Sequence, residues 1–179
     1  MSTVVRETKE TQIRVTVARG TGVANVDTTR PFLDHMLVAL ARYSGLDLAV
    51  HARGDLPHHL IEDVAICVGA AVAAALPPTA ARYADRTIPM DDALVQCAID
   101  LGGRSYYRGK LPVAIWDHWM RSFADNAKAT LHLRVIRGGD AHHIVEAAFK
   151  ALGLCIRDAF VESGAVFSTK GSVALQVSE

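Results

Sequence analysis

Apolar and polar side chains alternate in four segments of the chain. In the first of these segments, Ile13, Val15 and Val17 share one face, and the residues between them are polar. A period of two predicts a strand that buries one face and exposes the other. The four predicted strands are residues 11–17, 46–52, 93–101 and 131–136.

In four other segments, apolar residues recur every three or four positions. In the third of these segments, Trp119, Met120 and Phe123 fall together on one side. This spacing predicts amphipathic helices whose apolar stripe packs on a core. The four predicted helices are residues 34–43, 61–72, 116–128 and 145–156.

One short motif occurs twice, about half a chain apart. Residues 54–62 read Gly-Asp-Leu-Pro-His-His-Leu-Ile-Glu, and residues 139–146 read Gly-Asp-Ala-His-His-Ile-Val-Glu. Each copy follows a predicted strand and precedes a predicted helix, so the repeated unit is larger than the motif. We therefore expect an α+β fold, a single domain of two similar β-β-α-β-α halves with helices packed on mixed sheets. The expected halves are residues 1–88 and 89–179, with Pro77-Pro78-Thr79 near their seam.

The amino-acid composition indicates which binding partners and which cellular compartment to expect. Lysine plus arginine and aspartate plus glutamate number 19 each, which argues against nucleic acid or an anionic membrane as a general partner. The apolar stretch of residues 64–78 is short and ends in two prolines, so no membrane span is expected, and the polar start is no signal peptide. Cys67, Cys97 and Cys155 are odd in number and lie in apolar runs. Buried free thiols in a cytoplasmic, soluble protein explain them best.

Four of the eight histidines form the two adjacent pairs, His58-His59 and His142-His143. Neighbouring side chains on a helix point about 100° apart, so two adjacent imidazoles serve two different ions more naturally than one. A glutamate follows each pair at a spacing that places it on the same helix face. A single pair is most often incidental on a surface. Its recurrence with the glutamate in both repeats indicates a metal site.

Two other histidines extend this set. His35 begins a predicted helix beside Asp34, which could orient it, and His132 faces away from its flanking leucines. His51 and His118 lack such context and are interpreted as surface residues. The candidate ligands then give three nitrogens and one oxygen to each of two ions: His35, His58, His59, Glu62, His132, His142, His143 and Glu146. This thiolate-free set suits Mn²⁺, Fe²⁺ or Zn²⁺, and an octahedral ion would keep open positions for catalysis.

Eight motifs in fixed order extend beyond the histidines. They are residues 6–11 (Arg-x-Thr-Lys-Glu-Thr), 32–37 (Phe-Leu-Asp-His-Met-Leu), 54–63 (Gly-Asp-Leu to His-His-x-x-Glu-Asp), 89–94 (Pro-Met-Asp-Asp-Ala-Leu), 100–104 (Asp-Leu-Gly-Gly-Arg), 130–132 (Thr-Leu-His), 142–151 (His-His-Ile-Val-Glu-Ala-Ala-Phe-Lys-Ala) and 168–171 (Ser-Thr-Lys-Gly). In this ordered set the chain resembles the imidazoleglycerol-phosphate dehydratase family of histidine biosynthesis.

The resemblance implies a duplicated α+β fold of the ribosomal protein S5 domain 2-like type, with two Mn²⁺ ions bound by the eight residues above. It also implies a cage-like homo-oligomer of about 24 subunits with sites at subunit interfaces. The implied reaction removes water from imidazoleglycerol phosphate to give imidazoleacetol phosphate, with metal as Lewis acid and Glu10 as the base. The implied phosphate contacts are Arg82, Arg104, Ser168 and Lys170.

Several loops depart from the family pattern without changing a candidate ligand. Pro57 alone separates Gly-Asp-Leu from His-His, where the family has a longer stretch, and Asp92 stands where glutamate is usual. Two alternatives to the dehydratase follow. One is a diverged paralogue that dehydrates a related azole phosphate, and the other is a non-catalytic assembly protein organised by metal.

Overall fold

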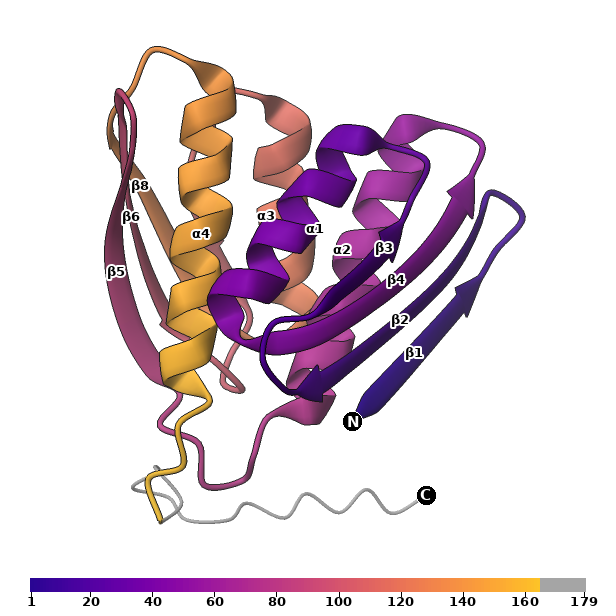
Figure 1. Cartoon of the computed structure of the whole chain (residues 1–179), viewed down its shortest axis with the longest axis horizontal. Helices are drawn as coiled ribbons and strands as arrows, with labels where there is room; N and C mark the ends of the chain where they lie inside the picture. Colours follow the sequence, from indigo (N-terminus) through magenta and orange to yellow (C-terminus); the bar gives the residue numbers. More distant parts are fainter. Residues whose placement is uncertain (165–179) are drawn as a thin grey trace, which may run out of the picture.

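Two four-stranded sheets form the outer layers of the molecule (Figure 1). The computed structural model describes residues 1–164, so the expected phosphate contacts Ser168 and Lys170 lie outside the described residues. The first sheet has the order β1-β2-β4-β3 and the second β5-β6-β8-β7. The strands are β1 (Ser2–Glu7), β2 (Thr11–Arg19), β3 (Ala24–Asp27), β4 (Leu46–Gly54), β5 (Tyr83–Met90), β6 (Ala93–Asp100), β7 (Tyr106–Arg108) and β8 (Thr130–Arg137).

Four helices fill the space between the sheets (Figure 1). They are α1 (Pro31–Ser44), α2 (Pro57–Ala75), α3 (Ala114–Asn126) and α4 (Ala141–Ala159). Helices α1 and α2 pack on the first sheet, and α3 and α4 pack on the second. Across the middle, α1 contacts α4 and α2 contacts α3. The apolar faces of both sheets and all four helices thus share one core, which explains the period-two and period-3.6 patterns together.

The expected α+β class, with helices packed on mixed sheets, is confirmed, but each half contains one more strand than expected. The observed order is β-β-β-α-β-α, because β3 and β7 each add a short strand parallel to its neighbour, β4 or β8. With four and three residues, these strands are too short for an alternating pattern to be recognised. Strand β5 spans residue 88, where the two halves are expected to meet, and pairs along its whole length with β6.

Strand direction brings the starts of all four helices to one end of the molecule, called here the helix-start end. Parallel strands β3 and β4 each lead into a helix, as do β7 and β8 in the other half. The antiparallel strands place the β1–β2 and β5–β6 turns at this same end. Both copies of the His-His-x-x-Glu motif therefore open a helix at the helix-start end (Figure 1).

Helix α2 is long and apolar enough to cross a membrane by length and composition alone, although half of that stretch is buried inside the protein. It packs against β1, β2 and α3. Its apolar composition is therefore accounted for by its position in the core. The expectation of free, buried cysteines is confirmed at Cys67, Cys97 and Cys155.

Candidate metal and active site

The first group of ligand-type side chains, called here the α4 cluster, joins α1 to the start of α4. Glu146 Oε2 lies 3.3 Å from His35 Nε2 and 3.2 Å from His142 Nε2. The two imidazole rings are 5.9 Å apart between centroids. These three residues offer ligand atoms that all lie within 4.8 Å of one another. Two nitrogens and one oxygen thus converge on one point.

Local structure holds the α4 cluster in place. Asp140 caps the helix by accepting a hydrogen bond from the backbone N–H of His142 at 2.7 Å. One turn on, Glu146 is buried, and its other oxygen, Oε1, lies 2.8 Å from Lys150 Nζ. Burial raises the pKa of Glu146, but the hydrogen bonds from Lys150 and His35 outweigh it and leave the pKa below its usual value. The carboxylate is therefore ionised, as a metal ligand requires.

The second group, called here the α2 cluster, joins the start of α2 to α3. His58 Nε2 lies 3.6 Å from Glu62 Oε2, and His118 Nε2 lies 3.2 Å from Glu62 Oε1. The rings of the two histidines stack at 5.3 Å between centroids. Their ligand atoms, too, lie within 4.8 Å of one another. The interpretation of His118 as an unrelated surface residue was wrong, because α3 packs on α2 and carries His118 to the predicted ligands.

The second histidine of each pair faces carboxylates instead of its cluster glutamate. His59 Nδ1 lies 3.0 Å from Asp55 Oδ1, and this hydrogen bond is the main reason that the pKa of His59 is raised. His143 Nδ1 lies 2.7 Å from Asp92 Oδ1, and its pKa is raised chiefly for the same reason. A histidine that donates through Nδ1 presents the lone pair of Nε2, so these carboxylates select a tautomer suited to metal binding.

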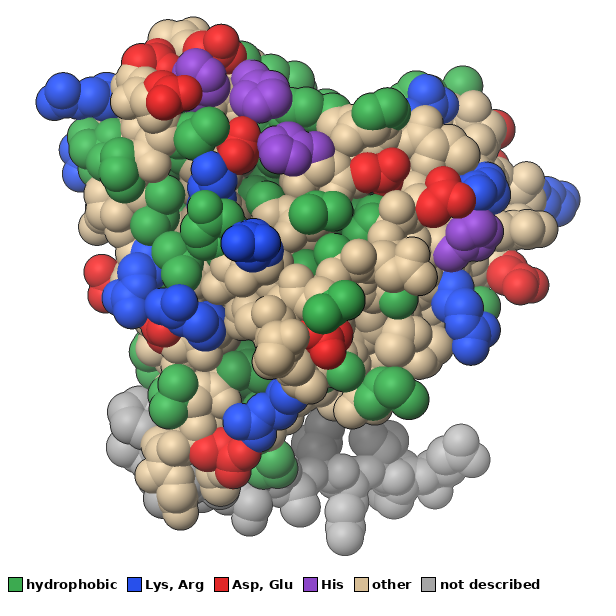
Figure 2. Space-filling model, in the orientation of Figure 1, with side chains coloured by type: hydrophobic (Ala, Val, Ile, Leu, Met, Phe, Trp, Pro, Cys, Tyr) green, Lys and Arg blue, Asp and Glu red, His purple; other side chains and the backbone are tan. Residues whose placement is uncertain are grey.

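The turn between β1 and β2 carries the predicted base, Glu10. Its backbone carbonyl accepts from Asp55 N–H at 3.1 Å, and its own N–H donates to Thr8 Oγ1 at 3.1 Å. These bonds place Glu10 Oε2 3.5 Å from His59 Nδ1, with the side chain 57% exposed. The turn between β5 and β6 repeats the arrangement, with Asp91 and Asp92 beside His143. Figure 2 shows histidine and acidic side chains gathered where α4 begins.

Other predicted site residues lie elsewhere on the chain. His132 is exposed on β8, between leucines that face the helices, with the Tyr106 ring 5.6 Å away between centroids. It therefore joins neither cluster of its own chain. Asp34 does not orient His35 as expected; it accepts hydrogen bonds from the backbone and hydroxyl of Thr28 at 2.9 and 2.6 Å. Its carboxylate is thus used to hold the turn that starts α1.

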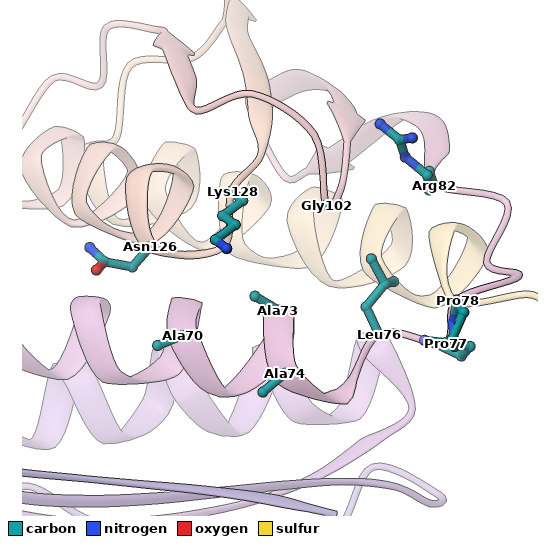
Figure 3. Close-up of a pocket in the computed structure, with 10 residues that line it drawn as sticks. All are labelled: Ala70, Ala73, Ala74, Leu76, Pro77, Pro78, Arg82, Gly102, Asn126 and Lys128. Atoms are coloured by element: carbon teal, nitrogen blue, oxygen red, sulfur yellow. The ribbon is translucent and has the colours of Figure 1, made fainter. Parts of the chain in front are cut away.

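The two described phosphate candidates lie at the opposite end from the α2 and α4 clusters. Arg82 forms an ion pair with Asp100 at 2.8 Å, where β6 ends, whereas β6 begins beside Asp92 at the helix-start end. Along this strand the separation is about 23 Å, at roughly 3.3 Å per residue. Arg82 borders a pocket of about 520 Å³ that is also lined by the last turn of α2 and by Lys128 (Figure 3). Arg104 is exposed in the loop after β6, and its carbonyl accepts from Thr130.

The chemistry of both clusters fits a divalent transition metal. Each offers imidazole nitrogens and one carboxylate at a spacing that a small shift would close around one ion. The three cysteines are buried in the core and do not compete as ligands. The protein donors of each cluster leave further positions open on the ion, so each cluster could accept additional protein or substrate ligands.

Comparison with known proteins identifies the family of the chain. The sequence model of the imidazoleglycerol-phosphate dehydratase family matches residues 28–156. The imidazoleglycerol-phosphate dehydratase of Pyrobaculum calidifontis is 46% identical over 182 residues, which cover 93% of this chain and 96% of that protein. The enzyme of the same name from Chlorobium luteolum is 41% identical over 187 residues, covering 95% of this chain and 94% of that protein.

Solved structures give the same result for the fold. The crystal structure of the Pyrococcus furiosus dehydratase, solved in complex with a small compound, superposes with a TM-score of 0.87 at 38% identity. The superposition covers 95% of this chain and 100% of that chain. The Staphylococcus aureus dehydratase superposes with a TM-score of 0.80 at 29% identity, covering 90% of this chain and 98% of that chain. The chain belongs to the imidazoleglycerol-phosphate dehydratase family. It is therefore an enzyme of the hydro-lyase class.

Proposed function

We propose that the protein removes water from imidazoleglycerol phosphate to give imidazoleacetol phosphate, a step of histidine biosynthesis, in the cytoplasm. One observation carries the proposal: in a chain of this family, two histidine–glutamate clusters lie at one end of the fold beside a carboxylate suited to act as base. A substrate with two imidazole nitrogens and a poor leaving group suits such a pair of clusters.

Two divalent metal ions, in the proposal Mn²⁺, bind the eight predicted ligands, and when bound they supply Lewis acidity to the imidazole of the substrate. Five of these ligands already lie in the two clusters of one chain. His59 and His143 stand beside the cluster histidines in the sequence, and each contacts a carboxylate through Nδ1. His132 lies on the far face of its sheet and is expected to reach a metal site of another copy.

Glu10 is proposed to take the proton from the substrate carbon. A base must reach its proton directly and must be ionised at working pH. The side chain of Glu10 extends from the β1–β2 turn toward solvent while staying 3.5 Å from the His59 ring. In the proposal, a substrate bound at the metal site presents its reacting carbon to this carboxylate.

Arg82, Arg104, Ser168 and Lys170 are proposed to bind the phosphate. The described pair is too far from the two histidine clusters of its own chain to reach the same small substrate. We therefore propose a homo-oligomer in which the phosphate end of one copy meets the helix-start end of another. The expected assembly of about 24 subunits would provide many such contacts. Arginine suits the role because its guanidinium binds phosphate oxygens in pairs.

The decisive experiment is a turnover assay on purified protein loaded with Mn²⁺. Imidazoleacetol phosphate should form, chelation should abolish its formation, and added Mn²⁺ should restore it. Glu10→Gln should lower kcat by at least about 100-fold, since a general base contributes on the order of 10² or more, while its Mn²⁺ content stays as in the wild type. Loaded protein that turns over only another azole phosphate would favour the paralogue. If Mn²⁺-loaded protein is inactive on every azole phosphate, the remaining alternative is the non-catalytic assembly protein organised by metal.

A further inference from the structure

The buried glutamate of the α4 cluster divides its two oxygens between different neighbours. Oε2 of Glu146 faces the ring nitrogens of His35 and His142. Oε1 lies 2.8 Å from Nζ of Lys150, a residue one turn further along the same helix. The lysine thus holds one oxygen, and the other is left directed toward the two imidazoles.

The α2 cluster shows the same division with a different donor. Oε2 of Glu62 lies 3.6 Å from His58 Nε2, and Oε1 lies 3.2 Å from His118 Nε2. Residue 66, one turn after Glu62, is an isoleucine, so no lysine can hold this carboxylate from the same helix. The ring of His118 reaches Oε1 from α3 instead.

The ring nitrogen of His118 needs this partner. Nε2 is shielded from solvent, and the 3.2 Å contact with Glu62 Oε1 does not meet hydrogen-bond geometry, although it is within ion-pairing distance. A shielded N–H without an aligned acceptor is destabilising. The Glu62 side chain is 34% exposed and can rotate. A small turn of its carboxylate would satisfy the N–H.

The backbone around His118 is fixed before any metal arrives. The preceding residue, Asp117, accepts from the Tyr107 hydroxyl at 2.7 Å and from Leu111 N–H at 2.9 Å. The following residue, Trp119, is fully buried in the core. The His118 ring itself stacks on His58, with an angle of 21° between the ring planes. A donor held this firmly can set the orientation of a softer neighbour.

We propose that His118 is a positioning residue for the metal site: it donates Nε2–H to Oε1 of Glu62 and so directs Oε2, together with His58, at the divalent ion of the α2 cluster. The inference rests on the proposed metal binding. Without the donor, the half-exposed Glu62 carboxylate would turn toward water and present its ligand oxygen only part of the time.

Two substitutions separate this role from ring packing and from direct ligation. His118→Phe keeps the stacking on His58 but removes the donor, and His118→Gln keeps an N–H near the position of Nε2. Mn²⁺ binding is followed by titration of metal-free protein, with free ion measured by electron paramagnetic resonance. One of the two ions should bind about 10- to 100-fold more weakly to His118→Phe, and both should bind His118→Gln within a few-fold of wild type.

The same two substitutions at His51 provide the control, since His51 is exposed on the first sheet and lies 3.7 Å from Asp27. Both His51 variants should bind Mn²⁺ as the wild type does. Wild-type affinity in His118→Phe would overturn the inference, as would a His118→Gln variant as weak as His118→Phe. If His118→Phe does not fold, His118→Ala, which adds no bulk, is used in its place and should show the same weakening of Mn²⁺ binding. Wild-type protein that binds no Mn²⁺ would instead overturn the proposed function on which the inference rests.

Discussion

At the scale of single residues, the loop before α2 gives His59 its partner. Pro57 is the first residue of the helix, so only Leu56 lies between Asp55 and α2. Asp55 thereby stands four residues before His59 and accepts its Nδ1 hydrogen bond at 3.0 Å. In the other half, a two-residue turn supplies Asp92 to His143 at 2.7 Å. The two loops differ in sequence but provide the same chemistry, so the short loop is compatible with an intact site.

The Cys67 thiol provides a test of burial at this scale. Desolvation raises the pKa of Cys67 from its ordinary value of 9.0 to about 11, although the nearby Arg6 charge opposes the shift. An unfolded chain therefore releases this proton at lower pH than the native protein does. Between these two values the unfolded state binds fewer protons, so native stability falls as pH rises from about 9 to 11.

We expect the wild type to lose about 2 kcal/mol more stability than Cys67→Ala between pH 8 and pH 10.5, because one pKa unit corresponds to about 1.4 kcal/mol. Denaturant unfolding at the two pH values measures the difference. The alanine variant is less stable throughout because of its cavity, and only the change with pH is compared. Parallel losses in the two proteins would show that the thiol is not protected by burial.

From the sequence, the histidines of the repeated motif are recognised as candidate ligands, but His118, which contacts one of them, is interpreted as a surface residue. His58 and His142 are recognisable because each opens a motif that recurs. His118 stands alone in its segment, and its contact with Glu62 depends on how α3 packs against α2. A signal was nevertheless present: Asp117-His118 opens α3 at the same position as Asp34-His35 opens α1. Comparison of the two halves helix by helix would have identified it.

At the scale of elements, the close approach of paired helices depends on two glycines. A Cβ added to Gly69 of α2 would lie 2.6 Å from the Phe123 carbonyl oxygen of α3, and one added to Gly153 of α4 would lie 2.9 Å from Tyr43 Cβ of α1. Both glycines stand in the same place in their repeat, eleven residues after the first histidine of the motif. In each helix pair, the close approach of the two helices thus depends on a glycine without a side chain.

Gly69→Ala should therefore destabilise the protein even though alanine favours helices. Overpacking costs about 1–3 kcal/mol, and the gain in helix propensity returns at most about 1 kcal/mol. We expect a net loss of about 1–2 kcal/mol and a lower thermal midpoint in calorimetry. The exposed Ala74, later in the same helix, supplies the control: Ala74→Gly should lose about 1 kcal/mol through propensity alone. A Gly69→Ala protein more stable than wild type would contradict the close contact.

Elements with one buried face are the ones that the sequence predicts well. Strands β2, β4 and β6 alternate between buried and more exposed residues along almost their whole length, and each was expected. Strand β5 has no such regularity, since three consecutive residues in its middle are exposed. Its place in the second sheet is set by pairing with β6, a long-range contact that periodicity does not report.

At the scale of the whole molecule, the chain separates two kinds of chemistry. The histidine clusters and Glu10 lie at the helix-start end, while Arg82 and Arg104 lie beyond the far end of β6. No motif spacing could have revealed this separation, because it follows from strand direction in the folded sheet. A substrate that carries an imidazole and a phosphate a few bonds apart cannot bridge it. If the two arginines bind the phosphate as proposed, a complete site requires two copies of the chain.

Mixing two inactive variants tests this shared site. His142→Ala damages the helix-start end, and Arg104→Ala damages the opposite end, so each pure assembly should turn over poorly. If one site draws its two ends from different chains chosen at random, co-expression of the two variants should make about a quarter of the sites wholly wild type. Steady-state activity of the mixed assembly should then rise to about a quarter of the wild-type value.

A mixture of His142→Ala with Glu146→Ala, both in the α4 cluster, should regain nothing, because every site keeps one damaged cluster. Equal, unrestored activity in both mixtures would mean that each chain completes its own site, contrary to the separation of its two ends.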